Sequence, residues 1–207
     1  MPRKVKAEAE KTRARILASA LALFAKNGYD RTTFTDIAAR LKMTKGAVYW
    51  HFESKEKLLM ALVDEMLAKF DRQIAENMPT GGLTYPAVAA MMVGNARRVA
   101  SEPRGRAFFL LMKTQVRWGE ASMARVREDL LTNQKCGPFH AFRQAVENDQ
   151  REGRVRPGVD PEEIASVSLA MWDGLVQAKI DGFLKQDVAV TLTHAYEATW
   201  KAIKNDL

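Results

Sequence analysis

Residues 43–59, MTKGAVYWHFESKEKLL, bring together side chains that can bind a polyanion. Lysines and hydroxyl groups can bind phosphate, and rings with polar atoms can reach base edges. Small residues permit close approach of a helix to those edges. The candidate DNA-contacting set, which includes hydroxyls just upstream, is Thr33, Thr35, Thr44, Lys45, Gly46, Ala47, Tyr49, Trp50, His51 and Lys55.

The net positive charge of the chain is concentrated in its first quarter. The 207 residues include 32 Lys+Arg and 25 Asp+Glu, a net charge of +7. Residues 1–55 hold 12 of these basic residues and 5 of the acidic ones, so they carry the whole excess. A basic module joined to a neutral remainder indicates a polyanion-binding domain attached to a regulatory or assembly domain. A merely solvated basic surface would spread the charge more evenly.

Three helices are expected to position these side chains. A helix over 10–27 precedes Gly28, and Thr35 is expected to cap a short second helix. After a turn at 42–44, Thr44 caps a third helix that runs to about His51. Two short helices joined by a three-residue turn, preceded by a longer helix, are typical of a helix-turn-helix.

The spacing of apolar residues predicts which sides of these helices face inward. Ile37, Ala38, Leu41, Val48 and Phe52 can meet Leu21 and Phe24 of the first helix. The polar and aromatic residues between 45 and 51 are then left on or beside the other face. The start of the third helix also offers backbone N–H groups and a positive dipole to phosphate.

Residues 16–58 resemble the DNA-binding domain of the TetR family, and KGAVYWHFESKEKL is similar to its AcrR-like subgroup, which represses multidrug efflux pumps. The resemblance implies that residues of the third helix meet the major groove and that Lys55 binds backbone phosphate. The family commonly has Ala-Gly where this chain has Leu41-Lys42. The family's glycine serves a turn position where a positive φ can be needed; Lys42 can adopt one at a cost of about 1 kcal/mol, and this departure leaves the turn geometry open.

The remainder of the chain is also predicted to be helical, because its sequence has almost no strand signals. Ser54 is expected to cap a connecting helix over 54–78. Further helices are expected over 84–101, 104–118, 122–150 with a break at Gly137-Pro138, 160–181 and 187–207. The predicted fold is all-α, with a helix-turn-helix domain over 1–53 and a helical-bundle domain for ligand binding and dimerisation over 54–207.

Methionines and aromatic residues lie at helical spacing through the bundle. Such side chains suit a cavity for apolar ligands, although core packing is the common alternative. Two polar members of these stripes, Asn95 and Gln115, could hydrogen-bond a ligand or a neighbouring helix backbone. The candidate ligand-lining residues are Met66, Phe70, Ile74, Met92, Asn95, Phe108, Met112, Gln115, Phe139, Phe142, Met171 and Trp172.

The last two helices have apolar and small residues at spacings of three and four. One side of this pair can pack in its own bundle and the other against a second copy. A homodimer would place two helix-turn-helix domains, here called heads, on a palindromic operator in double-stranded DNA. The candidate dimer residues are Val167, Gly174, Leu175, Ala178, Leu192, Tyr196, Thr199 and Ile203.

Enzymatic classes lack supporting motifs. There is no phosphate-binding loop and no dinucleotide-binding loop, and His140 and His194 have no partner at metal-ligand spacing. We therefore expect no catalytic residue, no metal and no cofactor. A single cysteine, Cys136, and the absence of a signal peptide or membrane-spanning segment favour a cytoplasmic protein.

The combined expectation is a homodimeric transcriptional repressor that a small apolar or amphipathic inducer releases from its operator. The head resembles regulators of multidrug efflux operons, while control of a catabolic or lipid-metabolism operon is the alternative. A helical scaffold without DNA binding is a more remote alternative, because it would not need the capped three-residue turn.

Overall fold

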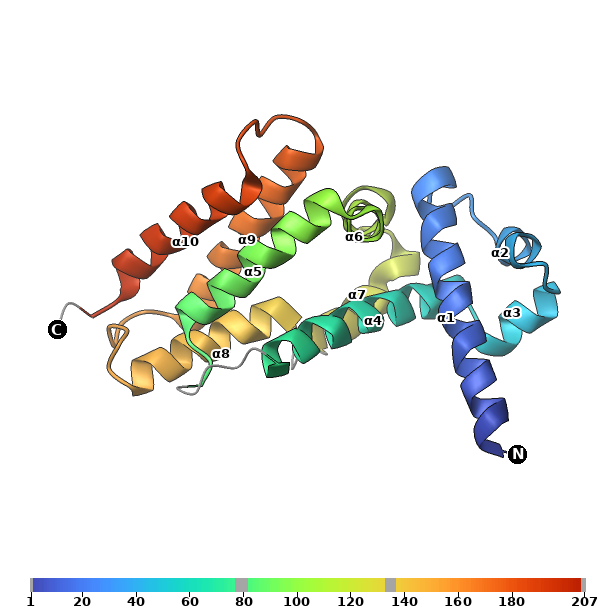
Figure 1. The fold of residues 1–207 in the computed structure, drawn as a ribbon, viewed down its shortest axis with the longest axis horizontal. Coiled ribbons are helices and arrows are strands. Elements are labelled where there is room, and N and C mark those ends of the chain that lie inside the picture. The colour runs from blue at the N-terminus through green and yellow to red at the C-terminus, as the bar shows by residue number, and fades with distance from the viewer. Residues whose placement is uncertain (1, 77–81, 133–136, 206–207) are drawn as a thin grey trace. The chain divides into compact units, whose positions relative to one another are not determined.

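The computed structural model describes residues 2–76, 82–132 and 137–205, and these form helices with only one isolated β-bridge, between Val155 and Lys204 (Figure 1). This confirms the all-α prediction. Within the described ranges, no helix is long and apolar enough to cross a membrane. The helices are α1 (Pro2–Asn27), α2 (Phe34–Leu41), α3 (Lys45–His51), α4 (Lys55–Glu76), α5 (Tyr85–Ser101), α6 (Pro103–Leu110), η1 (Leu111–Gln115), η2 (Ala121–Met123), α7 (Ala124–Thr132), α8 (Gly137–Arg151), α9 (Pro161–Ile180) and α10 (Val188–Ile203).

The helices pack into two compact units. The first contains residues up to Met66 together with 103–132, and the second contains residues 67–102 with the chain from 133 onward. This grouping differs from the predicted division between residues 53 and 54. The reason is that α6 and the π-helical turn η1 return to pack against α1.

The core of the first unit joins the three N-terminal helices. Ile16, Leu17 and Phe24 of α1 are buried with Ile37 of α2 and Val48 of α3. Phe52, Leu58 and Leu111 extend the same core, and Leu41 packs against it while partly buried. The predicted inward faces of α2 and α3 are confirmed.

The start of α2 corrects one expectation. Thr33, not Thr35, is the N-cap, because its hydroxyl oxygen accepts the backbone N–H of Asp36 while the Asp36 carboxylate accepts the N–H of Thr33 at 2.8 Å. Phe34 thereby becomes helical and is buried in the core. This reciprocal capping box satisfies two backbone donors at once.

Several other predicted helix starts are confirmed. The Thr44, Thr84, Asp160 and Asp187 side chains accept backbone N–H groups at the starts of α3, α5, α9 and α10. The Ser54 hydroxyl oxygen accepts the N–H of Lys57 at the start of α4. These capping bonds are local, so sequence alone could identify them.

Two segments differ from the predicted helices. The segment predicted over 104–118 leaves α-helical geometry after Leu110 and continues as η1 to Gln115. At the predicted break, α8 begins at Gly137, whose φ of +87° and close approach to Leu67 exclude a side chain. Residues 133–136, which include Cys136, and the predicted helix end at Met78 lie outside the described residues.

The second unit is organised around aromatic side chains from α5, α8 and α10. The Tyr85 ring centre lies 5.4 Å from that of Phe142 and 6.0 Å from that of Trp200, onto which it stacks. A buried carboxylate, Asp149, accepts the backbone N–H of Tyr85 at 2.8 Å and the Arg154 Nε–H at 2.7 Å. This bond ties the start of α5 to the end of α8.

Candidate DNA-binding surface and ligand groove

The helix α3 presents one face to the core and the other to solvent. Val48 is fully buried, whereas Lys45, Gly46 and Tyr49 are exposed and Trp50 is 75% exposed. The Thr44 hydroxyl oxygen accepts the N–H of Ala47 at 3.2 Å, which fixes the start of the helix. A short helix anchored on one side and small at its leading end can approach base edges in a DNA groove.

The turn between α2 and α3 is left-handed at Lys42, which settles the turn geometry that the sequence left open. Lys42 has φ 55° and ψ 43°, and its N–H donates to the Ala39 carbonyl at 3.2 Å. The next N–H, of Met43, donates to the Ala38 carbonyl at 2.9 Å. These bonds close the end of α2 and set the direction in which α3 leaves the turn.

Ring contacts order the exposed side chains of α3. The Tyr49 ring meets the edge of Phe34 with centroids 4.8 Å apart, and Lys45 Nζ lies 5.5 Å from the Tyr49 ring centre. The Trp50 and His51 rings meet at 4.6 Å, nearly perpendicular to one another. The surface is therefore preorganised for contact, with Lys45 and Tyr49 held as a pair.

Lys55, the predicted phosphate contact, binds other residues of the first unit. Its ammonium donates to the carbonyl of Tyr29 at 3.0 Å and to that of Asp30 at 3.2 Å. It also lies 4.4 Å from the Tyr29 ring centre. Lys55 thus fastens the start of α4 to the turn after α1, and its role in phosphate binding stays a prediction.

Thr33 caps α2, and Thr35 lies in the first turn of that helix. The Thr33 hydroxyl donates to the Asp36 carboxylate at 2.7 Å. Hydrogen bonds from the Thr33 side chain, and then from its backbone, lower the pKa of Asp36. Thr35 is exposed, so it can offer a hydroxyl to a ligand outside the helix.

Arg13 is a neighbour of α3 that the sequence pattern did not reveal. Its guanidinium carbon lies 5.0 Å from the ring centre of Phe52, the residue that ends α3. Burial, and then the charge of Arg13, lower the pKa of His51. The signal in the sequence was that Arg13 precedes the buried positions Ile16 and Leu17 at helical spacing.

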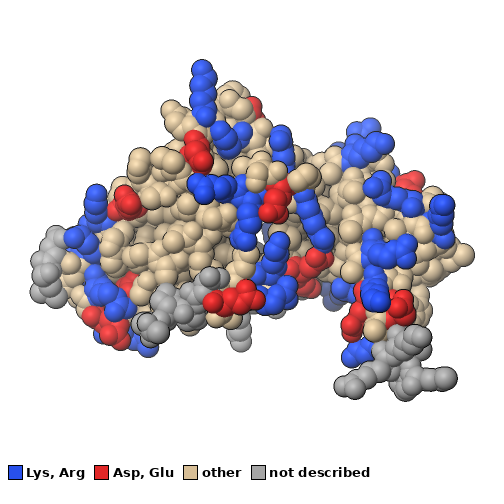
Figure 2. Space-filling model, in the orientation of Figure 1, with Lys and Arg blue, Asp and Glu red and all other residues tan. Residues whose placement is uncertain are grey.

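The charged side chains are mixed rather than segregated over the visible face of the molecule. Figure 2 shows Lys and Arg over the helices of the first unit with acidic side chains among them. Arg117, for example, lies 3.3 Å from Asp30 and 3.0 Å from Glu120. The candidate DNA-binding face therefore does not lie in a uniform basic field, since acidic side chains are interspersed among the basic ones.

The predicted ligand-lining residues divide between the two units. Met66, Phe108, Met112 and Gln115 belong to the first unit, and the remaining eight belong to the second. Among those eight, Met92 and Phe142 are fully buried, and the Trp172 indole N–H donates to the Met92 carbonyl at 2.9 Å. These three side chains pack as core, the alternative that their spacing left open.

Gln115 retains the features expected of a ligand contact. Its Oε1 is buried and has no hydrogen-bond partner among the described residues. The residue ends η1, and π-helical turns occur often at functional sites. The structure shows no comparable feature for Asn95, which is half-buried on α5.

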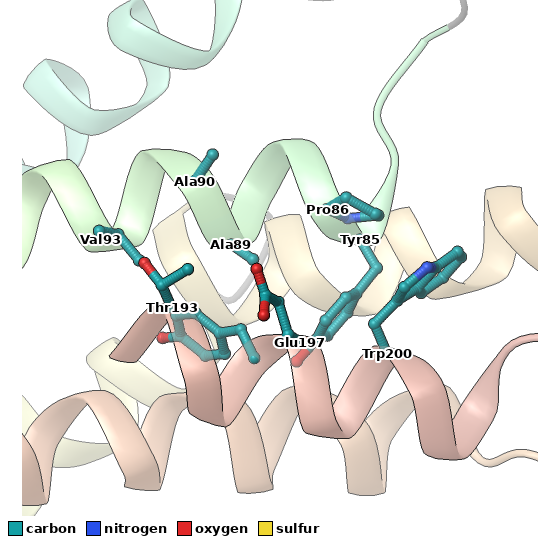
Figure 3. A pocket seen from close by; sticks show the side chains of 9 residues that line it. Tyr85, Pro86, Ala89, Ala90, Val93, Thr193, Glu197 and Trp200 are labelled. Carbon is teal, nitrogen blue, oxygen red and sulfur yellow. The ribbon is translucent and has the colours of Figure 1, made fainter. Parts of the chain in front are cut away.

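An apolar groove of about 320 Å³ lies between α5 and α10 (Figure 3). The Tyr85 hydroxyl is bonded to the Ser168 hydroxyl at 3.0 Å, and that of Tyr196 donates to the Ser168 carbonyl at 3.3 Å. Burial raises the pKa of both tyrosines, so their rings form a neutral floor. None of the predicted ligand residues lines it; its walls are Tyr85, Pro86, Ala89, Ala90, Val93, Thr193, Tyr196, Glu197 and Trp200.

Glu197 supplies the one formal charge of this groove. Figure 3 shows its carboxylate reaching from α10 toward Ala89 of α5. Glu197 is exposed, and among the described residues its carboxylate has no hydrogen bond or ion pair; the Tyr85 and Tyr196 rings line the same groove. The sequence did not reveal Glu197, because an acidic residue on a helix is usually a solvated one.

The predicted dimer residues fall into two groups. Leu192, Tyr196 and Ile203 are buried inside their own bundle, which corrects their assignment to a surface between copies. Their stripe on α10 faces α5 and α9, because those helices cover it. Val167 and Gly174 are exposed on α9, while Leu175, Ala178 and Thr199 are half-buried.

The chain is similar to known regulatory proteins. The description "Bacterial regulatory proteins, tetR family" matches residues 16–62. "Probable HTH-type transcriptional regulator ArpR" of Pseudomonas putida is 47% identical over 182 residues, covering 85% of this chain and 83% of ArpR. TtgR, an HTH-type transcriptional regulator of the same species, is 30% identical over 183 residues, covering 86% of this chain and 84% of TtgR.

A solved structure matches nearly the whole fold. SmeT, described as the repressor of the Stenotrophomonas maltophilia multidrug efflux pump SmeDEF, superposes with a TM-score of 0.72 and 25% identity. The match covers 94% of this chain and 91% of SmeT. The similarity therefore extends beyond the DNA-binding surface into the helical bundle.

Proposed function

The chain belongs to the TetR family of bacterial regulatory proteins, and from this we propose that it is a ligand-responsive repressor of a multidrug efflux operon. The observation that carries the proposal is α3, anchored by the buried Val48 and exposing Lys45, Gly46 and Tyr49 after a closed left-handed turn. The efflux assignment rests on the resemblance to SmeT. The protein acts as a DNA-binding regulator rather than as an enzyme.

In this proposal α3 enters the major groove of double-stranded DNA. Gly46 and Ala47 let its first turn approach the base edges, while Lys45 and Tyr49 contact the phosphates and bases beside them. Residues 1–53 form the DNA-binding domain, and residues from 54 onward serve ligand binding and dimerisation. The protein works in the cytoplasm, where the chromosome lies.

The repressor is proposed to act as a homodimer. The exposed side of α9 presents Val167 and Gly174, whose small size permits close packing against the same surface of a second copy. An isologous contact of this kind relates two heads by a two-fold axis. Two such heads match the two half-sites of a palindromic operator.

The ligand is proposed to be a small amphipathic molecule that binds the groove between α5 and α10. Its apolar part lies on the Tyr85, Tyr196 and Trp200 rings, and Glu197 attracts a positively charged group. The connecting helix α4 contributes residues to both units, so it can relay a ligand-dependent shift to the head. A ligand that favours a mis-spaced pair of heads would release the operator.

Selection from a library of randomised duplexes tests DNA recognition. The wild-type protein is expected to enrich a palindromic sequence and to lose affinity by orders of magnitude between about 50 and 200 mM salt. Tyr49→Ala should weaken binding, whereas Lys201→Ala, an exposed change on α10, should not. Enrichment of no sequence, together with a flat salt response, would exclude the proposed function.

The genomic position of the enriched sequence tests the efflux assignment. Under the proposal it lies upstream of genes for a pump, and transcription of those genes rises when the repressor gene is deleted. An operator beside a catabolic or lipid-metabolism operon would replace the efflux assignment while leaving DNA binding intact.

A further inference from the structure

The first half of α1 extends beyond the core of the first unit. The helix begins at Pro2; among its described side chains, which start at Lys6, residues 6–15 are exposed or half-buried and Ile16 is the first that is buried. Figure 1 shows the N-terminal half of α1 continuing past α3. A helical segment of this length is marginal in water by itself, so its helical form suits a surface that meets a partner.

The charged residues of this extension lie on two sides of α1. Lys6 and Arg13 are seven residues apart, about two helical turns, so they lie on the same side of α1. Lys11 is two residues from Arg13 and points roughly to the opposite side, where it pairs with Glu8 at 3.3 Å. Glu10 is four residues from Lys6 and three from Arg13, so it shares their side, and Arg15 shares the side of Lys11 and Glu8.

Arg13 connects this side of α1 to the DNA-binding helix. Its guanidinium lies 5.0 Å from the Phe52 ring centre, at the end of α3 and next to His51. A guanidinium that covers an aromatic ring keeps its N–H edges free for oxygen acceptors in its own plane. Arg13 therefore lies beside the C-terminal end of α3.

We propose that Arg13 and Lys6 form an accessory phosphate-binding edge that contacts the backbone of duplex DNA beside the segment bound by α3. The inference rests on the proposed DNA-binding function and adds a second contact region to it. Duplex DNA is the partner, because two basic side chains outnumber the one acidic side chain, Glu10, on this side, and Arg13 lies beside the end of α3. Both residues precede residues 16–62, the range that matches the family description.

The test compares charge removal on the two sides of one helix. Full-length Arg13→Gln, Lys6→Gln and the double variant are set against Lys11→Gln, the matched control on the opposite side. Dissociation constants are measured from about 50 to 200 mM salt on the duplex enriched by the wild type and on a scrambled duplex of equal length. Arg13→Lys keeps the charge and serves as the rescue variant.

Each lost phosphate contact is expected to reduce the slope of log affinity against log salt by about 1 for each bound head. Affinity should fall by the same factor on the selected and scrambled duplexes, because phosphate contacts carry no sequence information. Arg13→Lys should restore most of the slope. Ethylation of the DNA phosphates should identify a position that interferes with wild-type binding and not with the double variant.

Equal slopes for Lys6→Gln and Lys11→Gln, with no phosphate position lost, would overturn the inference while wild-type operator binding stands. Failure of the wild type to enrich any duplex would instead refute the proposed function. If Arg13→Gln lowers the melting temperature of the protein, Lys6→Gln decides the question alone, since Lys6 is exposed and lies outside the core.

Discussion

The ammonium group of Lys55 lies 4.4 Å from the centre of the Tyr29 ring and donates a hydrogen bond to the Tyr29 carbonyl at 3.0 Å. One side chain at the start of α4 thus closes the C-terminal end of α1 and the turn that follows. Lys55, the predicted phosphate contact, therefore has a structural role in the free protein.

Replacement of Lys55 by Met should destabilise the first unit. The variant loses two hydrogen bonds to carbonyl oxygens and a cation–π contact, for an expected cost of about 1–2 kcal/mol. Chemical denaturation measures the change, and Lys57→Met, at an exposed neighbouring position, is the control. Equal stability of the two variants would show that Lys55 does not fasten α4.

Replacement of Lys42 by Gly should stabilise the protein. Lys42 has φ 55°, a conformation that glycine adopts without the steric cost borne by other residues. We expect a gain of about 1 kcal/mol, whereas Lys42→Ala, which removes the charge and keeps the strain, should not show it. A gain in both variants would attribute the effect to charge instead of backbone conformation.

Protonation of His51 should couple to DNA binding. Burial, and then the charge of Arg13, hold the pKa of His51 below its ordinary value of 6.5, so the free protein carries it neutral at pH 7. Nearby phosphates favour the charged form, so the complex takes up a proton and affinity should rise as pH falls from about 7 to 6. His51→Gln should remove this part of the pH dependence, as titration of binding would show.

The same pKa shift has a consequence for folding. Because the unfolded chain binds this proton at higher pH than the folded one does, the contribution of His51 to stability is lost as pH falls below about 6.5. Arg13→Gln should raise the pKa of His51 in the free protein, which NMR titration of the imidazole measures. An unchanged pKa would mean that burial alone causes the shift.

Replacement of Glu197 by Gln should weaken binding of organic cations in the groove between α5 and α10. Benzyltrimethylammonium and its neutral isostere neopentylbenzene differ only in charge, so their affinities separate Coulomb attraction from apolar contact. We expect a loss of a few-fold for the cation, below about 1 kcal/mol because Glu197 is exposed, and no loss for the isostere. Glu163→Gln on α9, an exposed acidic position outside the groove, is the control.

Cation binding that is equal in Glu197→Gln and the wild type would place the ligand elsewhere. Gln115 would then be the next position to examine, because its Oε1 is buried without a partner among the described residues. Ala90→Phe, which fills the exposed lip of the groove, should block both probes if they bind there.

Local chemistry made much of the DNA-binding head predictable. Thr44 caps α3 as predicted, because a cap depends on a few consecutive residues. Periodicity alone identified Ile37 and Val48 as inward-facing. The cap of α2 was placed two residues late, because the burial of Phe34, which moves the helix start to Thr33, depends on a core built from distant residues.

The sequence by itself determined most of the helices, most of their caps and the position of α3, since each follows from neighbours along the chain. Only the tertiary structure decided which partners the side chains meet. Phe142 packs in the core, Lys55 fastens Tyr29, and Glu197 lines an aromatic groove, because helix periodicity defines a face but not the helix that covers it.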